Sequence, residues 1–419
     1  MPTAPFSKPP RTQLALAIIA LFPLAPFSPA WAEASRPVLK TVVVTAQAPV
    51  EALTYSIDPK LPRQPMPASD GADYLKTIPG FSALRNGGTN GDPVLRGMFG
   101  SRLNLLTNDG SMPGACPSRM DNPMSYVAPE TFDQLVVIKG PQTVLWGPGA
   151  SAGTVRFERQ VEPFDEPGLR ASGSLLGGSF DRADQVADLV AGMPQGHVRV
   201  SGNRSRADDY RNGDGDEVPA AWKKWNTDLS LGWTPDAHTL VEASFGRGDG
   251  WARYAGRGMD GSQFERTSHA LRFKRQKPDG VLHGIEASAF HNTADHVMDN
   301  YSLRQPNPQG TMPMAMVSNV DRETWGGRVV AEWRWKRFSL HTGADIQESE
   351  HRQRGGMGED VHRAQPWSRD AKFANAGLFT ELNWTLSERQ RWVAGARLDQ
   401  AQVTDLRAML RSTSGHGHG

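Results

Sequence analysis

The sequence predicts a small mixed α/β domain followed by the antiparallel strands of a transmembrane β-barrel. The chain is polar for its 419 residues, with a mean hydropathy of -0.50. It holds 43 glycines and 12 tryptophans, and from about residue 170 apolar and polar residues alternate. A membrane barrel has this composition because every second residue of each strand faces a polar lumen. A soluble periplasmic β-sandwich has the same alternation and stays the alternative.

The N-terminus has the pattern of an export signal. Lys8 and Arg11 precede the apolar run 14–22, and Ala30 and Ala32 form a cleavage site of the A-x-A type. The run is too short and too rich in proline to span a membrane as a helix. Residues 1–32 are therefore predicted to be a signal peptide that is removed on export.

Three further segments follow the signal. Residues 33–70 are rich in proline and predict an extended arm and linker. Residues 71–160 predict a compact mixed α/β domain with strands at 103–106 and 135–138. Residues 161–419 predict barrel strands.

The strand prediction depends on the period of two in the second half of the chain. In residues 228–233, Leu229, Leu231 and Trp233 share one face, and polar residues take the other. The same pattern recurs in three more segments, 329–336, 376–386 and 392–398. Long polar stretches separate the strands, and tryptophans near strand ends suit an aromatic belt at a membrane interface.

The single cysteine is the most specific chemical signal. Cys116 precedes Met120 by four residues, with Met112 and Met124 close by. A thiolate and a thioether are soft donors, which prefer Cu(I). If the segment is helical, with Pro117 in its first turn, Cys116 and Met120 lie on one side. The alternative is a buried cysteine that acts as a small apolar residue.

Several ordered motifs resemble those of TonB-dependent outer-membrane receptors, in which a plug domain sits inside a β-barrel. Residues 74–80 resemble an early plug motif, 95–97 its Arg-Gly element, and 136–153 its late glycine-rich motif. The segment that resembles the TonB box comprises Thr41, Val42, Val43, Val44, Thr45 and Ala46. The resemblance implies a receptor of the bacterial outer membrane, in contact with its lipid and with TonB as partner.

Within this family the chain is most similar to the TonB-dependent copper receptors. These are understood to build one copper site from a C-x-x-x-M motif in the plug and an H-x-M motif in the barrel. The resemblance implies four copper ligands, Cys116, Met120, His296 and Met298. Copper, favoured as Cu(I), would be bound cargo rather than a resident cofactor. The alternatives are a receptor for a siderophore or another metal chelate, and a metal-binding remnant that does not transport.

Other features carry weaker signals. Met312, Met314 and Met316 form a methionine-rich loop that either collects copper or only packs flexibly, and His351 with Met357 is weaker still. The acidic stretch 208–217 lacks the spacing of a calcium loop and predicts a solvated loop.

Charge and motifs argue against two other classes of protein. The 46 basic and 45 acidic residues create no field that attracts nucleic acid. Nucleotide-binding, zinc-protease and serine-hydrolase motifs are absent from the sequence, so an enzyme is not predicted.

The length predicts an incomplete barrel. Residues 171–419 hold about half of the roughly 22 strands of a plugged outer-membrane transporter. The tail 412–419 lacks the terminal aromatic strand usual in such barrels and contains His416 and His418, which could bind metal weakly. A truncated product, or a barrel that a second polypeptide completes, is expected.

Overall fold

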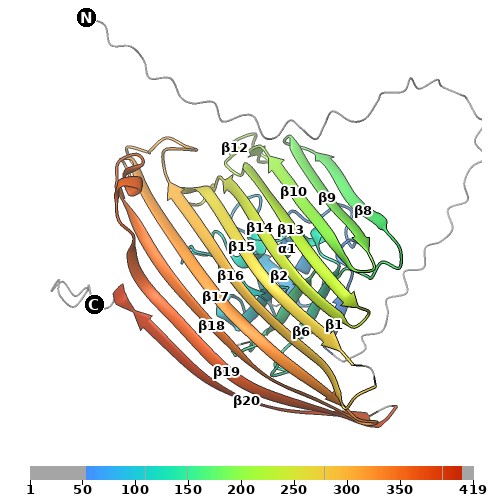
Figure 1. The fold of residues 1–419 in the computed structure, drawn as a ribbon. Coiled ribbons are helices and arrows are strands. Elements are labelled where there is room, and N and C mark those ends of the chain that lie inside the picture. The colour runs from blue at the N-terminus through green and yellow to red at the C-terminus, as the bar shows by residue number, and fades with distance from the viewer. Residues whose placement is uncertain (1–52, 109, 149, 278, 389, 408–419) are drawn as a thin grey trace, which may run out of the picture. The chain divides into compact units, whose positions relative to one another are not determined.

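A computed structural model describes residues 53–407, apart from positions 109, 149, 278 and 389 (Figure 1). The predicted signal peptide (1–32), the predicted TonB box (41–46) and the histidines at 416 and 418 lie outside the described residues. No helix in the described part of the chain has the length and apolar character needed to cross a membrane.

The first part of the described chain is a mixed α/β unit, which we call the plug (residues 53–160). Its sheet has five strands in the order β1-β6-β7-β4-β5, and only β4 and β7 pair in parallel. The strands are β1 (Thr54–Ile57), β4 (Leu103–Thr107), β5 (Gly110–Ser111), β6 (Gln134–Lys139) and β7 (Gly153–Glu158). The predicted strands at 103–106 and 135–138 are thus β4 and β6.

Shorter elements cover this sheet. They are a two-stranded sheet of β2 (Phe81–Leu84) and β3 (Asp92–Leu95), helix α1 (Gly71–Leu75), and the 3-10 helices η1 (Gly100–Arg102), η2 (Pro123–Tyr126) and η3 (Pro129–Thr131). Helix α1 begins after Asp70, whose carboxylate accepts the Asp73 N–H at 2.8 Å. Such a cap contributes about 1 kcal/mol. The plug core includes Leu75, Ile78, Leu135 and Val155, all fully buried.

Strand β1 falls within residues 33–70, for which the sequence predicted an arm and linker. Its four residues pair with β6 from Thr54 opposite Ile138 to Ile57 opposite Leu135. Only one edge of β6 is occupied by β7, so the chain just before the helical turn can add a strand at the other edge. The end of the arm is therefore part of the plug sheet.

The second half of the chain forms an 11-stranded antiparallel sheet, which we call the wall. Its strands, in spatial order, are β8 (Gly168–Gly178), β9 (Arg182–Met193), β10 (Gly196–Ala207), β13 (Trp222–Asp236), β14 (Thr239–Ala252), β15 (Asp260–Gln276), β16 (Leu282–Asp299), β17 (Met316–Arg334), β18 (Phe338–Met357), β19 (Ser368–Ser387) and β20 (Gln390–Asp405). Within the described residues β8 and β20 are the two edges and do not pair with each other. The barrel is open, as the length predicts.

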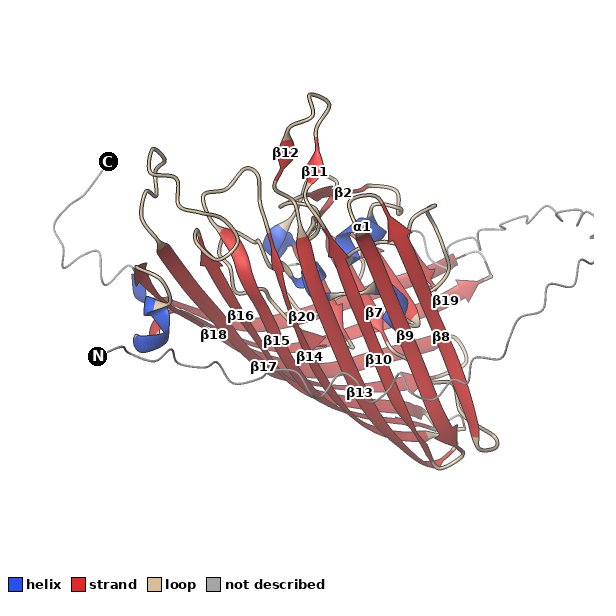
Figure 2. Ribbon diagram, turned by 90° about the horizontal axis from the view of Figure 1, so that it is seen from above, coloured by secondary structure: helices blue, strands red, loops and turns tan. Residues whose placement is uncertain are grey.

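Connections alternate between the two ends of the wall. Strand β13 ends at Asp236 and β14 begins at Thr239, whereas β16 ends at Asp299 and β17 begins only at Met316. The long connections carry the β11 (Tyr210–Arg211) and β12 (Glu217–Val218) hairpin and η4 (Val361–Ala364). Figure 2 shows these loops gathered at one end of the strands. The long connections agree with the long polar stretches that separate the predicted strands in the sequence.

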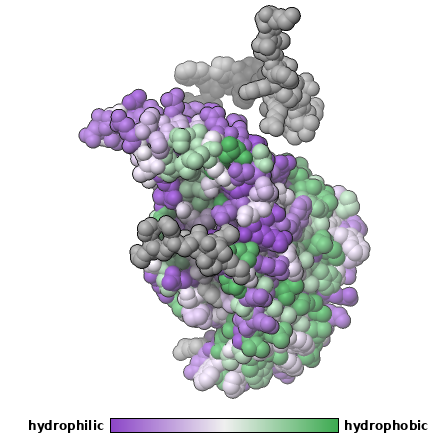
Figure 3. Space-filling view, turned by 90° about the vertical axis from the view of Figure 1, so that its left-hand side faces the viewer, coloured by the Kyte–Doolittle hydropathy of each residue, from purple (hydrophilic) through white to green (hydrophobic). Residues whose placement is uncertain are grey.

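The alternating residues of the wall place apolar side chains outward. In β13, Leu231 and Trp233 are 43% and 59% exposed, whereas Ser230, just before Leu231, is buried. A soluble sandwich would bury the apolar face instead, so this orientation favours the membrane barrel over that alternative. Figure 3 shows hydrophilic residues at the loop end and hydrophobic residues gathered lower on one side.

Exposed aromatic residues also mark the end of the wall with short turns. Trp384 lies opposite Trp392 across β19 and β20, and its ring stacks on Phe338 with centroids 5.4 Å apart. Trp335 is exposed next to the same turn as Phe338. This placement agrees with the aromatic belt predicted from the sequence.

Ion pairs join the plug to the inner face of the wall. Lys60 of the plug contacts Asp133 of the plug at 2.7 Å and Asp188 of β9 at 2.8 Å. Arg199 of β10 donates to both carboxylates as well. Asp188 and Arg199 are buried, so loss of one partner would leave an uncompensated buried charge, and the cluster thereby ties the plug to the wall.

Candidate metal centre

Cys116 lies in the plug between β5 and η2, in a segment that forms a turn and not the helix considered from the sequence. The Arg119 N–H donates to the Cys116 carbonyl at 2.9 Å, and Arg119 adopts a left-handed φ of 57°. The carboxylate of Asp121 accepts the N–H groups of Ala115 and Cys116, each at 2.8 Å. A left-handed residue at position 119 is incompatible with a right-handed helix that runs from Pro117 through Met120, so the helical arrangement considered from the sequence is not found.

The turn nevertheless brings Cys116 and Met120 into one buried cluster. Cys116 is 6% exposed and Met120 is 3% exposed. The cluster combines plug and wall residues: Met112, Ala115, Cys116, Met120 and Tyr126 from the plug, with Ala207, Trp222, Ala252, Tyr254, Phe264, Ala294 and Val320. Met298 packs against it. Two sulfur side chains of the plug therefore face the wall at one place.

His296 and Met298 come from β16, close to its end at the long loops. They are two residues apart, so a strand places both on the same face. The Met298 Sδ atom lies 3.7 Å from the Cys116 Sγ atom. Two sulfur ligands, each about 2.3 Å from a tetrahedral metal ion, lie about 3.8 Å apart. The measured separation is thus one that a single metal ion could bridge.

The His296 imidazole is oriented with one nitrogen free. Its Nδ1 atom lies 2.9 Å from the Gln263 carbonyl oxygen, which can only accept, so Nδ1 carries the proton. The ring is fully buried and stacks on Phe264 at 4.6 Å. The Nε2 atom has no hydrogen-bond partner within the described structure. A backbone carbonyl on one nitrogen and an open second nitrogen is the usual arrangement of a metal-binding histidine.

The structure therefore brings together the predicted residues from both halves of the site. Cys116 touches Met298, Met120 shares their cluster, and His296 stacks on Phe264 of the same cluster. Among the described residues, no group of three or more His, Cys, Asp or Glu side chains is placed to hold a metal ion. The candidate donor set is thus mainly methionine and cysteine sulfur.

Sequence reasoning missed the groups that hold the cysteine loop. The Tyr126 hydroxyl donates to Asp121 at 2.9 Å. From the wall, His351 of β18 donates from Nε2 to the Ala115 carbonyl at 2.6 Å, and its Nδ1 contacts Asp370 of β19. His351 had been considered only as a weak metal candidate. The sequence did offer one indication of a turn, because Asp121 and Asn122, two residues that favour turns, follow Met120 directly.

Burial raises the pKa of the Cys116 thiol, and the nearby Asp121 carboxylate adds to the increase. The thiol is therefore protonated near neutral pH when no metal is bound. A soft metal ion would replace that proton on binding.

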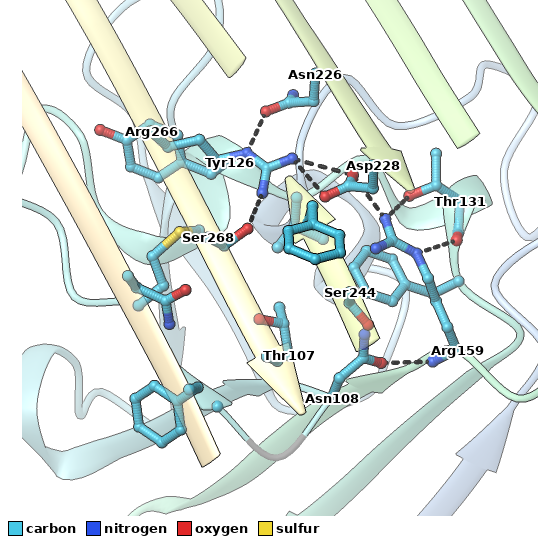
Figure 4. Close-up of a pocket in the computed structure, with 18 of the residues that line it drawn as sticks. Thr107, Asn108, Tyr126, Thr131, Arg159, Asn226, Asp228, Ser244, Arg266 and Ser268 are labelled. Carbon is cyan, nitrogen blue, oxygen red and sulfur yellow. Dashed lines mark hydrogen bonds and ion pairs between the residues drawn. The ribbon is translucent and has the colours of Figure 1, made fainter. Parts of the chain in front are cut away.

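Next to the cluster lies a small polar cavity of about 60 Å³ (Figure 4). Met112 and Tyr126 line it and also belong to the sulfur cluster. Within it, Arg159 of the plug and Arg266 of β15 both bind Asp228 of β13, at 2.9 and 3.0 Å. The largely apolar sulfur cluster thus lies next to a group of hydrogen-bonded charged side chains.

The remaining sequence candidates lie at the loop end. Met314 and Met357 are exposed, and Met316 pairs in register with Met357. Asn300 binds the carbonyls of Met312 and Met314, so the loop is held by backbone contacts. Its proposed copper-collecting role stays a prediction. The acidic stretch forms the exposed β11–β12 hairpin, in agreement with a solvated loop.

Two family models match the chain. Residues 50–154 match the TonB-dependent Receptor Plug Domain, and residues 201–415 match the TonB dependent receptor-like beta-barrel. The solved structure of copper transporter OprC is 57% identical, with a TM-score of 0.83. The match covers 85% of this chain and 56% of that one, so this chain spans little more than half the length of that protein.

More distant relatives carry other cargoes in their names. The FrpB iron transporter of Neisseria meningitidis, in its apoprotein form, is 16% identical with a TM-score of 0.65, over 84% of this chain and 58% of that one. This likeness concerns the fold alone. A hemin receptor of Yersinia pestis is 25% identical over 138 residues, 30% of this chain and 20% of that protein.

Proposed function

The chain belongs to the TonB-dependent receptor family, and from this premise we propose that it captures copper at the outer membrane for import driven by TonB. The family consists of receptors rather than enzymes. Outer-membrane location agrees with a sheet whose apolar residues face outward. The likeness to copper transporter OprC supports copper as the cargo.

The contact between Cys116 and Met298 carries the proposal. These residues are 182 positions apart, and their sulfur atoms lie 3.7 Å from each other. With Met120 and the open Nε2 of His296, they supply one thiolate, two thioethers and one imidazole. This set suits Cu(I), whereas Mg²⁺ and Ca²⁺ prefer oxygen ligands. Methionine is also not among the usual ligands of zinc.

The division of the ligands between plug and wall suggests how release is driven. Cys116 and Met120 belong to the plug, and His296 and Met298 to β16. Copper bound by all four would join the two parts. Displacement of the plug by TonB, acting through the proposed box at 41–46, would separate the sulfur atoms and break the coordination. Capture and release would then use one site in two plug positions.

The alternative is a receptor for a siderophore or another metal chelate, and one partial relative reported above is a hemin receptor. Such a cargo is bulky and would be held by aromatic and arginine side chains near the loops. The Cys116–Met298 contact is instead buried inside a cluster with Phe264 and Trp222. The donor chemistry therefore favours a small soft ion.

Copper content measured after purification tests the proposal. The wild-type chain, loaded with Cu(I) under reducing conditions, is expected to retain about one equivalent, and Cys116→Ser is expected to lose most of it. Met66→Leu is a matched control because Met66 is exposed and distant in sequence from the site. Full copper retention in Cys116→Ser would show that the proposed site is wrong. Binding of a ferric chelate instead would favour the alternative cargo.

A further inference from the structure

Asp121 lies beside the candidate centre without being one of its proposed ligands. It follows Met120 directly, and its side chain is fully buried. Its Oδ1 atom accepts the Cys116 N–H at 2.8 Å. Its Oδ2 atom accepts the Ala115 N–H at 2.8 Å and the Tyr126 hydroxyl at 2.9 Å. These bonds hold the backbone next to the Cys116 sulfur in one shape.

Within the described residues, no lysine or arginine forms a direct ion pair with Asp121. Arg119, two positions away, pairs with Asp92 instead. Arg257 donates to the Asn86 side chain at 2.7 Å. A buried carboxylate without a paired cation is unfavourable, and a cation bound nearby would relieve this cost.

One buried cation near the loop, Arg322, interacts with the Asp121 charge at longer range, without a direct ion pair. Arg322 of β17 lies over the Phe373 ring, with its guanidinium carbon 5.8 Å from the ring centroid. The other members of the sulfur cluster are apolar or neutral side chains. Asp121 is therefore the negatively charged side chain that holds the cysteine loop, because its carboxylate accepts hydrogen bonds from the loop backbone.

We propose that Asp121 is a positioning residue that holds the cysteine loop in its metal-binding shape and makes the centre select a bare cation over an anionic chelate. The inference rests on the proposed function and specifies its cargo. Cu(I) bound to a thiolate is neutral overall, and Asp121 adds one negative charge beside it. A cation approaching this charge is attracted, and an anionic complex is repelled.

Charge-selective labelling tests the field without copper. Cys116 is the only cysteine of the chain, so thiol reagents report on it alone. Rates are compared for a cationic and an anionic methanethiosulfonate of similar size, on the full chain. The cationic reagent is expected to react faster. Asp121→Asn should lower the ratio of rates, and Tyr126→Phe, which removes a hydrogen bond but keeps the charge, should not.

A wild-type ratio at or below one overturns the proposal, whether or not the asparagine variant folds. An unchanged ratio in Asp121→Asn, with a wild-type melting temperature, overturns it as well.

Copper affinity provides the second readout, and it distinguishes a failure of the Asp121 inference from a failure of the proposed function. In competition with a Cu(I) chelator, Asp121→Asn is expected to bind on the order of 10- to 100-fold more weakly, as is usual for groups that support metal ligands. Tyr126→Phe should lose less. If wild type binds copper and Cys116→Ser does not, equal affinity in Asp121→Asn refutes this inference alone. If wild type binds no copper, the proposed function fails, and the labelling ratio still tests the field.

Discussion

The two halves of the candidate centre are built in different ways. His296 and Met298 occupy a regular strand, and their common direction follows from its period of two. Cys116 and Met120 occupy an irregular turn whose shape depends on Asp121 from the plug and His351 from the wall. The strand half is therefore a stable template. The loop half is the part whose geometry can be altered by substitutions at non-ligand positions.

The largest effect is expected from the strand half, in His296→Leu. This change removes the only proposed nitrogen ligand and keeps an apolar side chain of moderate size next to Phe264. Copper affinity should fall by more than the roughly 100-fold typical of an outer group. The free energy of unfolding should change by less than about 2 kcal/mol, because the lost bond to Gln263 is offset by removal of an unpaired buried nitrogen. Competition with a chelator measures the copper affinity, and thermal melting measures the stability. An undiminished affinity would show that His296 is not a copper ligand.

The next effect is expected from Gly114→Ala, which alters the loop half without touching a ligand. A Cβ atom at Gly114 would lie 1.9 Å from the Asp121 carbonyl oxygen, so the turn must shift. Overpacking of this kind costs about 1–3 kcal/mol, and copper affinity should fall with it. Gly177→Ala is the control, because a Cβ there meets nothing within 4 Å. Equal copper affinity in both variants would contradict the view that loop shape determines binding.

A smaller effect is expected when the wall no longer holds the loop. His351→Ala removes the 2.6 Å bond to the Ala115 carbonyl and leaves the internal Asp121 bonds intact. Copper affinity should fall by about tenfold, at the lower end for supporting groups. His291→Ala, a half-exposed histidine paired with Glu323 on the wall, is the control. A loss as large as that of His296→Leu would mean that His351 itself binds the metal.

The smallest effect concerns pH and the ion pairs that join the plug to the wall. Burial opposes ionisation of Asp133, but hydrogen bonds and charge from Arg199 and Lys60 lower its pKa below the ordinary 3.8. Its stabilising contribution is therefore complete above about pH 4 and is lost as the pH falls through the lowered value. Hydrogen exchange of β6 should accelerate in that acid range. In Asp133→Asn this acid sensitivity should be reduced, and an unchanged profile would exclude Asp133 as its source.

Much of the fold could be predicted from residue patterns, for physical reasons that differ by region. In β13, Leu231 and Trp233 alternate with polar residues, and a strand has only two faces on which to place them. Residues 103–106 and 135–138 were predicted as strands and are β4 and β6. Strand β1 was not predicted, because four residues at a sheet edge become a strand only through pairing with β6.

In the candidate centre, too, some features follow from local sequence patterns and others depend on contacts between distant residues. The positions of all four proposed ligands came from motif resemblance, and the common face of His296 and Met298 follows from strand geometry. The sequence left the local conformation at Cys116 open, with a helix as one possibility, and the structure has a turn that Asp121 holds through the N–H groups of Ala115 and Cys116. His351 lies 236 residues from the Ala115 carbonyl that it binds, and no local pattern indicates such a contact.

By itself, then, the sequence determined which soft donors the protein carries, the alternation that turns apolar side chains outward, and the order of plug and strands. Only the tertiary structure decided that Cys116 and Met298 lie 3.7 Å apart, that the His296 Nε2 is left open, and that Asp121 is buried without a direct ion pair among the described residues. The physical reason is that periodicity and donor chemistry are local properties of the chain. The distance between two sulfur atoms and the balance of buried charge arise only when plug and wall are packed together.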